Sequence, residues 1–243
     1  MLMFSKDLVP TKEKPHPLLD LKGSQRDKFA LQSFLFTVLV ILVMYVLPNL
    51  HWLEVLTTNT SLFFLQVFNF RPRFFTYEDN LGNLADFDLL MYNVGDSIRS
   101  TYPAISIETG NVPNHYLIVK ACTGLQAGAL LVGLIWSTPS RPGDQIRASY
   151  LVLIALFIGN TLRIASMIAI TTILTVDFNL IYEPSWNYAH NIMGRPLGFV
   201  GTIGFVAIIE KTGVKMLDTI TVWIDTLIYY FDKVYAKIFP KKK

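Results

Sequence analysis

Three residues of this sequence combine a nucleophile, a proton-transfer group and a fixed positive charge: Cys122, His190 and Arg163. The thiolate form of cysteine is the nucleophile, and a free thiol has a pKa of about 8.5. A nearby arginine favours the thiolate because the guanidinium group keeps its proton in proteins. A histidine can protonate a leaving amine and then accept a proton from a second nucleophile. The set therefore indicates covalent, nucleophilic catalysis.

The residues that follow Cys122 add to this chemistry. We expect a helix to begin at Thr123, so that Cys122 lies at its N-terminus, where unpaired N–H groups and the helix dipole favour an anion. The backbone N–H groups of Thr123 and Gly124 could face a developing oxyanion. Gly124 and Gly128 also have the spacing of a close-packed helix face, for which packing alone is the simpler explanation.

Each of these residues has a plainer explanation. A cysteine near a helix end is commonly a small buried hydrophobe, and a histidine at a helix start is often a cap or interface residue. An arginine inside a membrane span is costly to bury, so Arg163 indicates a functional site or an anchor that reaches the interface. Asn160 and Asn191 could orient Arg163 and His190, and ordinary polar contacts between helices explain them equally well.

The composition is that of a membrane protein. Hydrophobic residues make up 52% of the 243 residues, charged residues only 16%, and the mean hydropathy is +0.41. Soluble domains carry about 25% charged residues, so charge is too scarce here to cover a solvated globule. The net charge of +3 does not indicate nucleic-acid binding. The single cysteine excludes an internal disulfide and a cysteine-rich zinc site, and we expect no metal and no cofactor.

Apolar segments predict an all-α polytopic membrane protein with about four to six transmembrane helices. Spans are expected at residues 29–47, 123–140, 148–176 and 190–209. Two more helices, each expected to lie on a membrane surface, cover residues 50–70 and 214–239. Alternating apolar residues at 105–109 and 115–119 predict a small external β-hairpin just before the second span.

The positions of Lys and Arg orient these spans. The loop 141–147 and the C-terminal segment 211–243 are basic and therefore expected in the cytoplasm, whereas segment 49–121 is mainly acidic and expected outside. The chain then consists of a cytoplasmic segment 1–28, an integral membrane catalytic domain 29–210 that includes the external segment, and a C-terminal amphipathic helix with a basic tail.

This topology brings Cys122, Arg163 and His190 to one depth. Cys122 precedes the second span at its outer end, and His190 begins the fourth span on the same side. Arg163 is sixteen residues from Arg147 at the inner edge, a rise of about 24 Å in a hydrocarbon core of about 30 Å. We therefore expect the three side chains to meet near the outer membrane boundary.

The sequences around these positions resemble the three signatures of a known family. Residues 121–124 are ACTG, residues 160–164 are NTLRI, and residues 190–194 are HNIMG. Their order and spacing are similar to those of the exosortase/archaeosortase family of membrane cysteine transpeptidases. The resemblance covers residues 105–204, and the ACTG element favours the archaeosortase branch.

The resemblance implies a protein-sorting enzyme in the cell membrane, with cytoplasmic termini and an external active site. Cys122 would cleave a C-terminal sorting signal of secreted proteins, made of a short motif, a transmembrane helix and a basic tail. The thioester would pass to an amine, expected to belong to a membrane lipid. Arg163 takes the family's arginine role, and His190 or alternatively Arg195 takes the third. Supporting residues are Thr123, Gly124, Asn160 and Asn191.

Two other classes of protein stay open. A small transporter or channel could use Arg163 as its internal charge, but a transport path should carry polar groups at several depths. A non-catalytic membrane scaffold would tolerate replacement of Cys122.

Overall fold

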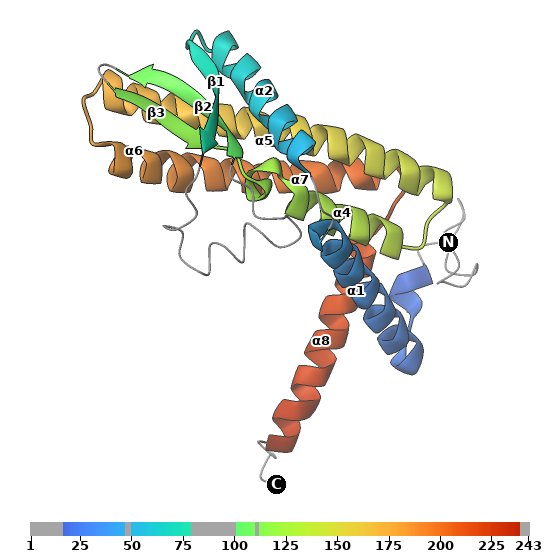
Figure 1. Ribbon diagram of the computed structural model, residues 1–243. Coiled ribbons are helices and arrows are strands. Elements are labelled where there is room, and N and C mark those ends of the chain that lie inside the picture. Colours follow the sequence, from blue (N-terminus) through green and yellow to red (C-terminus); the bar gives the residue numbers. More distant parts are fainter. Residues whose placement is uncertain (1–16, 47–49, 79–100, 110–111, 239–243) are drawn as a thin grey trace. The chain divides into compact units, whose positions relative to one another are not determined.

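The computed structural model describes residues 17–46, 50–78, 101–109 and 112–238, which form helices and one small sheet (Figure 1). The helical elements are η2 (Pro17–Asp20), α1 (Gly23–Val46), α2 (His51–Val67), η4 (Lys120–Thr123), α4 (Leu125–Ser137), α5 (Pro142–Val176), α6 (Tyr182–Tyr188), η5 (Ala189–Gly194), α7 (Arg195–Lys211) and α8 (Met216–Ile238). The strands are β1 (Pro72–Glu78), β2 (Thr101–Thr109) and β3 (Val112–Leu117). Parts of the predicted segments 1–28, 49–121 and 211–243 lie outside the described residues.

Three described helical stretches are long and apolar enough to cross a membrane: Gly23–Met44, Pro142–Val176 and Tyr182–Lys211. They coincide with the first, third and fourth predicted spans. The third begins earlier than predicted, because the expected loop 141–147 is almost entirely the first part of α5. Pro142 at the first helical position and Asp144 in the first turn both favour a helix start there.

The helix expected at residues 123–140 is shorter in the structure. α4 has 13 residues, which corresponds to about 20 Å against a core of about 30 Å. Gly124 precedes the helix and has a left-handed backbone with φ of 76°. The predicted helix face of Gly124 and Gly128 is therefore wrong, because only Gly128 is helical; there it packs on Leu153 and Leu156 of α5.

Both helices predicted to lie on surfaces are helical in the structure, as α2 and α8. α2 ends because Asn69 takes a left-handed conformation with φ of 67°. The Phe70 N–H then donates to the Leu65 carbonyl at 3.0 Å, which satisfies one of the last carbonyls of the helix. This turn directs the chain into β1.

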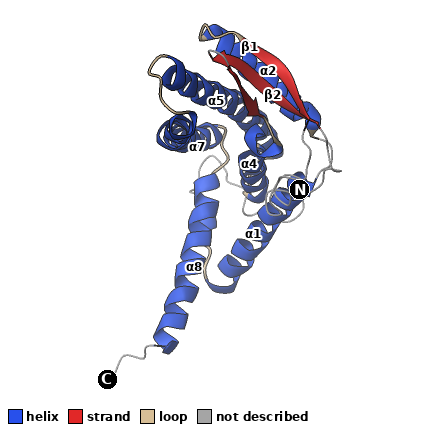
Figure 2. Ribbon diagram, turned by 60° about the vertical axis from the view of Figure 1, so that its left-hand side comes forward, coloured by secondary structure: helices blue, strands red, loops and turns tan. Residues whose placement is uncertain are grey.

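The predicted β-hairpin is confirmed as β2 and β3, with Ile105 opposite Tyr116. The structure adds β1, which pairs antiparallel with β2 and completes a sheet of order β1-β2-β3. β1 was missed because its apolar residues Phe74 and Phe75 are adjacent rather than alternating, and both remain partly exposed. Figure 2 shows the strands lying along α2.

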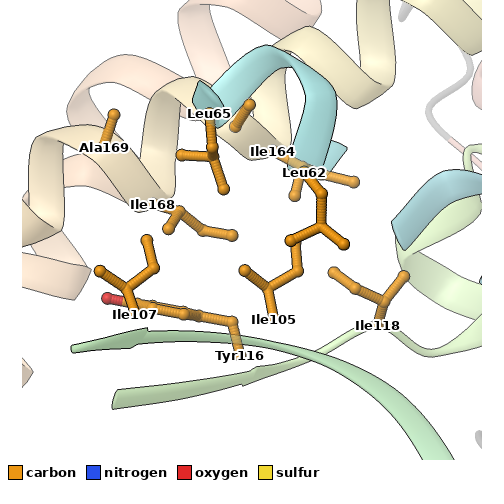
Figure 3. Packing of buried hydrophobic residues seen from close by; sticks show 10 residues of the cluster. Leu62, Leu65, Ile105, Ile107, Tyr116, Ile118, Ile164, Ile168 and Ala169 are labelled. Atoms are coloured by element: carbon orange, nitrogen blue, oxygen red, sulfur yellow. The ribbon is translucent and has the colours of Figure 1, made fainter. Parts of the chain in front are cut away.

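A buried cluster joins the sheet to α2 and α5. Side chains from all three elements point into it, as Figure 3 shows. Its members are Leu62, Leu65, Ile105, Ile107, Tyr116, Ile118, Ile164, Ala165, Ile168 and Ala169. Cys122 and Trp186 pack against its edge. The same apolar contacts that stabilise the sheet therefore position the cysteine-bearing turn.

The chain divides into two compact units. One consists of Val43–Gly128 and Leu153–Phe205 and contains the sheet together with every predicted site residue. The other consists of Met1–Leu42, Ala129–Val152 and Val206–Lys243. In this second unit, hydroxyl and indole groups link the helices: Trp223 Nε1 donates to Ser33 Oγ at 2.6 Å, and the Thr138 and Thr219 hydroxyls are 2.9 Å apart.

In the second unit α1 and α4 approach each other closely at Gly133. A β-carbon added to Gly133 would lie 2.9 Å from Thr37 Cγ2 and 3.1 Å from the Thr37 Cα. A β-carbon on Gly143, in the first turn of α5, meets nothing within 4 Å. Only the first glycine is required for packing.

We expect Gly133→Ala to lower the free energy of unfolding by about 1–3 kcal/mol, because the added methyl group presses on backbone atoms that cannot yield. Gly143→Ala, the matched control, should be neutral or stabilise by up to about 1 kcal/mol. Thermal unfolding in detergent measures both. Equal melting temperatures for the two variants would show that α1 and α4 do not pack at this glycine.

Candidate functional site

Cys122 lies in a short 3-10 turn, η4, between the sheet and α4. The turn is closed by the Cys122 N–H, which donates to the Val119 carbonyl at 2.7 Å. Thr123 is buried, and its hydroxyl accepts from the Leu125 N–H at 3.4 Å. The sequence predicted that Cys122 directly precedes a helix, but in the structure Cys122 lies within the turn and α4 begins three residues later. A left-handed glycine separates this turn from α4.

Asn160 fixes this turn from α5. Its side-chain Nδ2 donates to the Cys122 carbonyl at 2.6 Å. A β-carbon on Gly124 would meet the Asn160 side chain at 3.4 Å, in addition to the strain of a positive φ. The sequence left two roles open for Asn160, to orient Arg163 or to make an ordinary polar contact between elements. The structure gives Asn160 the Cys122 carbonyl as its hydrogen-bond partner.

Arg163 lies one turn further along α5, on the same face as Asn160. Its positive charge acts on the Cys122 thiol. A β-carbon on Gly198 of α7 would lie 3.5 Å from Arg163 Nη1, an ordinary van der Waals contact, so the guanidinium group lies close to the α7 backbone at this glycine. Arg163 Nε is buried and has no hydrogen-bond partner among the described residues. This N–H is a donor that a bound substrate could use.

Burial raises the pKa of the Cys122 thiol above its ordinary value. A backbone hydrogen bond at Val119 and the Arg163 charge lower this pKa, and the Glu54 carboxylate raises it. Burial is the largest of these effects, because the thiolate loses its hydration in apolar surroundings. The resting thiol therefore keeps its proton, and the arginine only partly offsets the cost of ionisation.

His190 lies in η5, a π-helical turn between α6 and α7. Its Nδ1 is 3.4 Å from the Asn191 side-chain oxygen, and its ring centroid is 6.1 Å from that of Trp186. Trp186 in turn packs against the cluster that Cys122 borders. Among the described residues no hydrogen bond joins His190 to Cys122, and Trp186 contacts both His190 and the cluster that Cys122 borders.

The remaining predicted residue, Arg195, is exposed at the start of α7. The structure thus gathers Cys122, Thr123, Gly124, Asn160 and Arg163 in one place. His190 and Asn191 form a pair next to Trp186, and Arg195 follows them in the chain.

Helix α2 contributes polar residues that sequence analysis missed. Glu54, Thr57 and Ser61 are each at most 2% exposed, and α2 packs against η4. The Thr57 and Ser61 hydroxyls have no hydrogen-bond partner among the described residues. A buried hydroxyl without a partner costs about 1–3 kcal/mol. The signal was present in the sequence, since Glu54 is the sole charged residue of the apolar segment 50–70.

Within the described ranges, no group of three or more His, Cys, Asp or Glu side chains is placed to hold a metal ion. No protein-family model, curated protein or solved structure matches this chain.

The pH dependence of Cys122 alkylation tests its electrostatic surroundings. Because its pKa is raised, the rate with iodoacetamide should still be climbing above pH 8.5, where an ordinary thiol is half ionised. Arg163→Gln removes a charge that lowers this pKa and should slow alkylation further at each pH below the plateau. Arg73→Gln, at an exposed arginine on β1, is the control and should have no effect. A wild-type plateau below pH 8 would contradict a raised pKa.

Asn160→Asp tests the link between α5 and η4. The carboxylate cannot donate to the Cys122 carbonyl at neutral pH, so the variant should unfold with a free energy about 1–3 kcal/mol lower. Hydrogen exchange at residues 119–124 should quicken by the corresponding factor. The neighbouring Thr161 bonds within its own helix, and Thr161→Val is the control. Unchanged exchange in Asn160→Asp would remove the role assigned to this hydrogen bond.

Proposed function

We propose that this chain is a membrane cysteine transpeptidase that cleaves a C-terminal sorting signal and transfers the new C-terminus to an amine, in the manner of the archaeosortases that its three sequence elements resemble. The observation that carries the proposal is the hydrogen bond from Asn160 to the Cys122 carbonyl, which holds the chain's sole thiol beside the helix that bears Arg163. The Arg163 charge acts on this thiol from a different element. Secreted proteins are the proposed substrates.

The proposed reaction begins with a protonated thiol. Cys122 Sγ attacks the carbonyl carbon of the scissile peptide, and the thiol proton passes to the leaving amine as the C–N bond breaks. We assign this transfer to His190. Arg195 is the alternative third residue, as a cation for the oxyanion or for the substrate, because its guanidinium group keeps its proton. The guanidinium group of Arg163 would stabilise the thiolate and the oxyanion in a site that excludes water.

In the proposed topology, both termini are cytoplasmic and the Cys122 turn is at the external face. The described helices supply three stretches able to cross a membrane. A substrate whose own transmembrane helix ends near Cys122 would need no long-range movement before cleavage. The acceptor amine would then come from the same boundary, where lipid headgroups are concentrated.

We expect Cys122→Ala to abolish processing of a co-expressed protein that ends in a motif, an apolar helix and a basic tail. Arg163→Gln should reduce processing about 100-fold or more, because one preorganised charge contributes on that scale. Arg163→Lys should restore part of it. Electrophoretic mobility of the substrate and membrane fractionation of the enzyme are the measurements.

His190→Ala and Arg195→Ala decide the third residue, with His115→Ala on the exposed side of β3 as the matched control. The variant that loses processing identifies it. Full processing of the substrate by a membrane-inserted Cys122→Ala protein would contradict the proposed function.

A further inference from the structure

A buried polar strip on α2 lies beside the cysteine turn and is not used by the proposed cleavage. It consists of Glu54, Thr57 and Ser61, which succeed each other along one side of the helix at intervals of three and four residues. All three are almost fully buried, and Leu65, four residues after Ser61, continues the same side of the helix into the core with the sheet. The polar residues thus occupy the N-terminal part of the buried side of α2, and the apolar residues occupy its C-terminal part.

The position of this strip relates it to Cys122. α2 packs against η4, and the Glu54 charge acts on the Cys122 thiol. Glu54 does not favour the attack of Cys122 on the scissile peptide, because an anion near the thiol opposes thiolate formation. A carboxylate here suits a different step, in which a positively charged group approaches the acyl-cysteine.

The proposed second step brings such a group. An amine acceptor is an ammonium ion in water at neutral pH and cannot attack until it loses a proton. A carboxylate attracts the ammonium and is a base within reach of the proton. The hydroxyls of Thr57 and Ser61, which have no hydrogen-bond partner among the described residues, provide further acceptors along the same strip.

Resting on the proposed function, we propose that Glu54, with the Thr57 hydroxyl beside it, binds the cationic primary amine that accepts the acyl group from Cys122 and takes the proton that this amine must lose.

His51 links this buried carboxylate to the surface. Its Nδ1 is 3.4 Å from Glu54 Oε2, and its side chain is 46% exposed while that of Glu54 is 2% exposed. An entering ammonium group exchanges one nitrogen donor at the carboxylate for another. The buried charge then keeps a hydrogen-bond donor throughout, which avoids the cost of leaving it bare.

The step balances as follows. The ammonium gives one proton to Glu54, and the neutral amine attacks the thioester carbonyl. The new C–N bond forms as the C–S bond breaks, and the sulfur leaves as a thiolate that Arg163 stabilises. The nitrogen's second proton goes to this thiolate and regenerates the thiol. Glu54 then releases its proton to solvent, so that the net reaction yields an amide and one proton.

The sole cysteine makes a direct test possible. The full chain in detergent is acetylated with p-nitrophenyl acetate, and the Cys122 thioester is identified by peptide mass spectrometry. Its loss is then followed with ethanolamine, a cationic amine, and with hydroxylamine, which is neutral at the assay pH. We expect the ethanolamine rate to saturate in the wild type. In Glu54→Gln it should be linear in amine and at least tenfold slower, with the hydroxylamine rate unchanged.

Three further variants sharpen the result. Glu183→Gln, which removes an exposed carboxylate on α6, is the charge-matched control and should behave as wild type. Thr57→Val should raise the half-saturating ethanolamine concentration and leave the maximal rate unchanged. Glu54→Asp keeps the charge and serves if the glutamine variant does not fold; it should retain saturation at a reduced maximal rate.

To learn whether the amine comes from a lipid or from a soluble compound, the same ethanolamine group is supplied on a lipid and on a water-soluble molecule. N-acetylation of phosphatidylethanolamine in mixed micelles, at a rate above that of glycerophosphoethanolamine, identifies a lipid headgroup; the reverse identifies a soluble amine. An equal loss with ethanolamine and hydroxylamine in Glu54→Gln would overturn the inference, as would a wild-type ethanolamine rate that never saturates. Neither result bears on cleavage by Cys122. The processing assay of the co-expressed substrate tests that cleavage separately.

Discussion

One hydrogen bond, from the Asn160 side chain to the Cys122 carbonyl, sets the arrangement around the thiol. At 2.6 Å it ties the cysteine turn to a helix 38 residues away in sequence. Arg163 follows Asn160 by one helical turn, so the residue that holds the backbone and the residue that supplies the charge share one face of α5. Gly124 supports this arrangement, because it ends the turn in a left-handed conformation that residues with a side chain rarely adopt.

The electrostatics of this site depend on the competition between burial and charge. Burial raises the pKa of Cys122, and the opposed charges of Arg163 and Glu54 act on it in opposite directions. A protonated resting thiol is protected from oxidation and adventitious alkylation, since the thiolate is the reactive form. Ionisation of the Cys122 thiol then requires the interactions that a bound substrate contributes, so the nucleophile becomes reactive only when substrate is bound.

Local patterns predicted much of this fold. The apolar runs predicted the helices, and strict alternation predicted the hairpin of β2 and β3, because both signals involve near neighbours in the chain. β1 was not predicted, since its adjacent phenylalanines alternate poorly and its pairing with β2 spans a long stretch of sequence. The start of α4 was misplaced because helical propensity does not reveal that Gly124 adopts a positive φ.

For the site, the sequence indicated Cys122 and Arg163 by residue type, and topology suggested that they meet. It did not predict the partner of Asn160 or the packing of α2 on the cysteine turn, which are consequences of tertiary contacts alone. Glu54 was overlooked for the same reason. One carboxylate in an apolar helix becomes informative only when its burial and its neighbours are known.

The π-helical turn η5 has a consequence for helical phase. Trp186, which packs on the core, and Gly198, which faces Arg163, are twelve residues apart. In a regular α-helix they would point about 120° apart, at about 100° per residue. A π turn takes up one additional residue, which reduces the difference to about 20°. The extra residue of η5 thus restores the helical phase, so that Trp186, which packs on the buried cluster, and Gly198, which lies close to Arg163, point to nearly the same side of one continuous helical stretch.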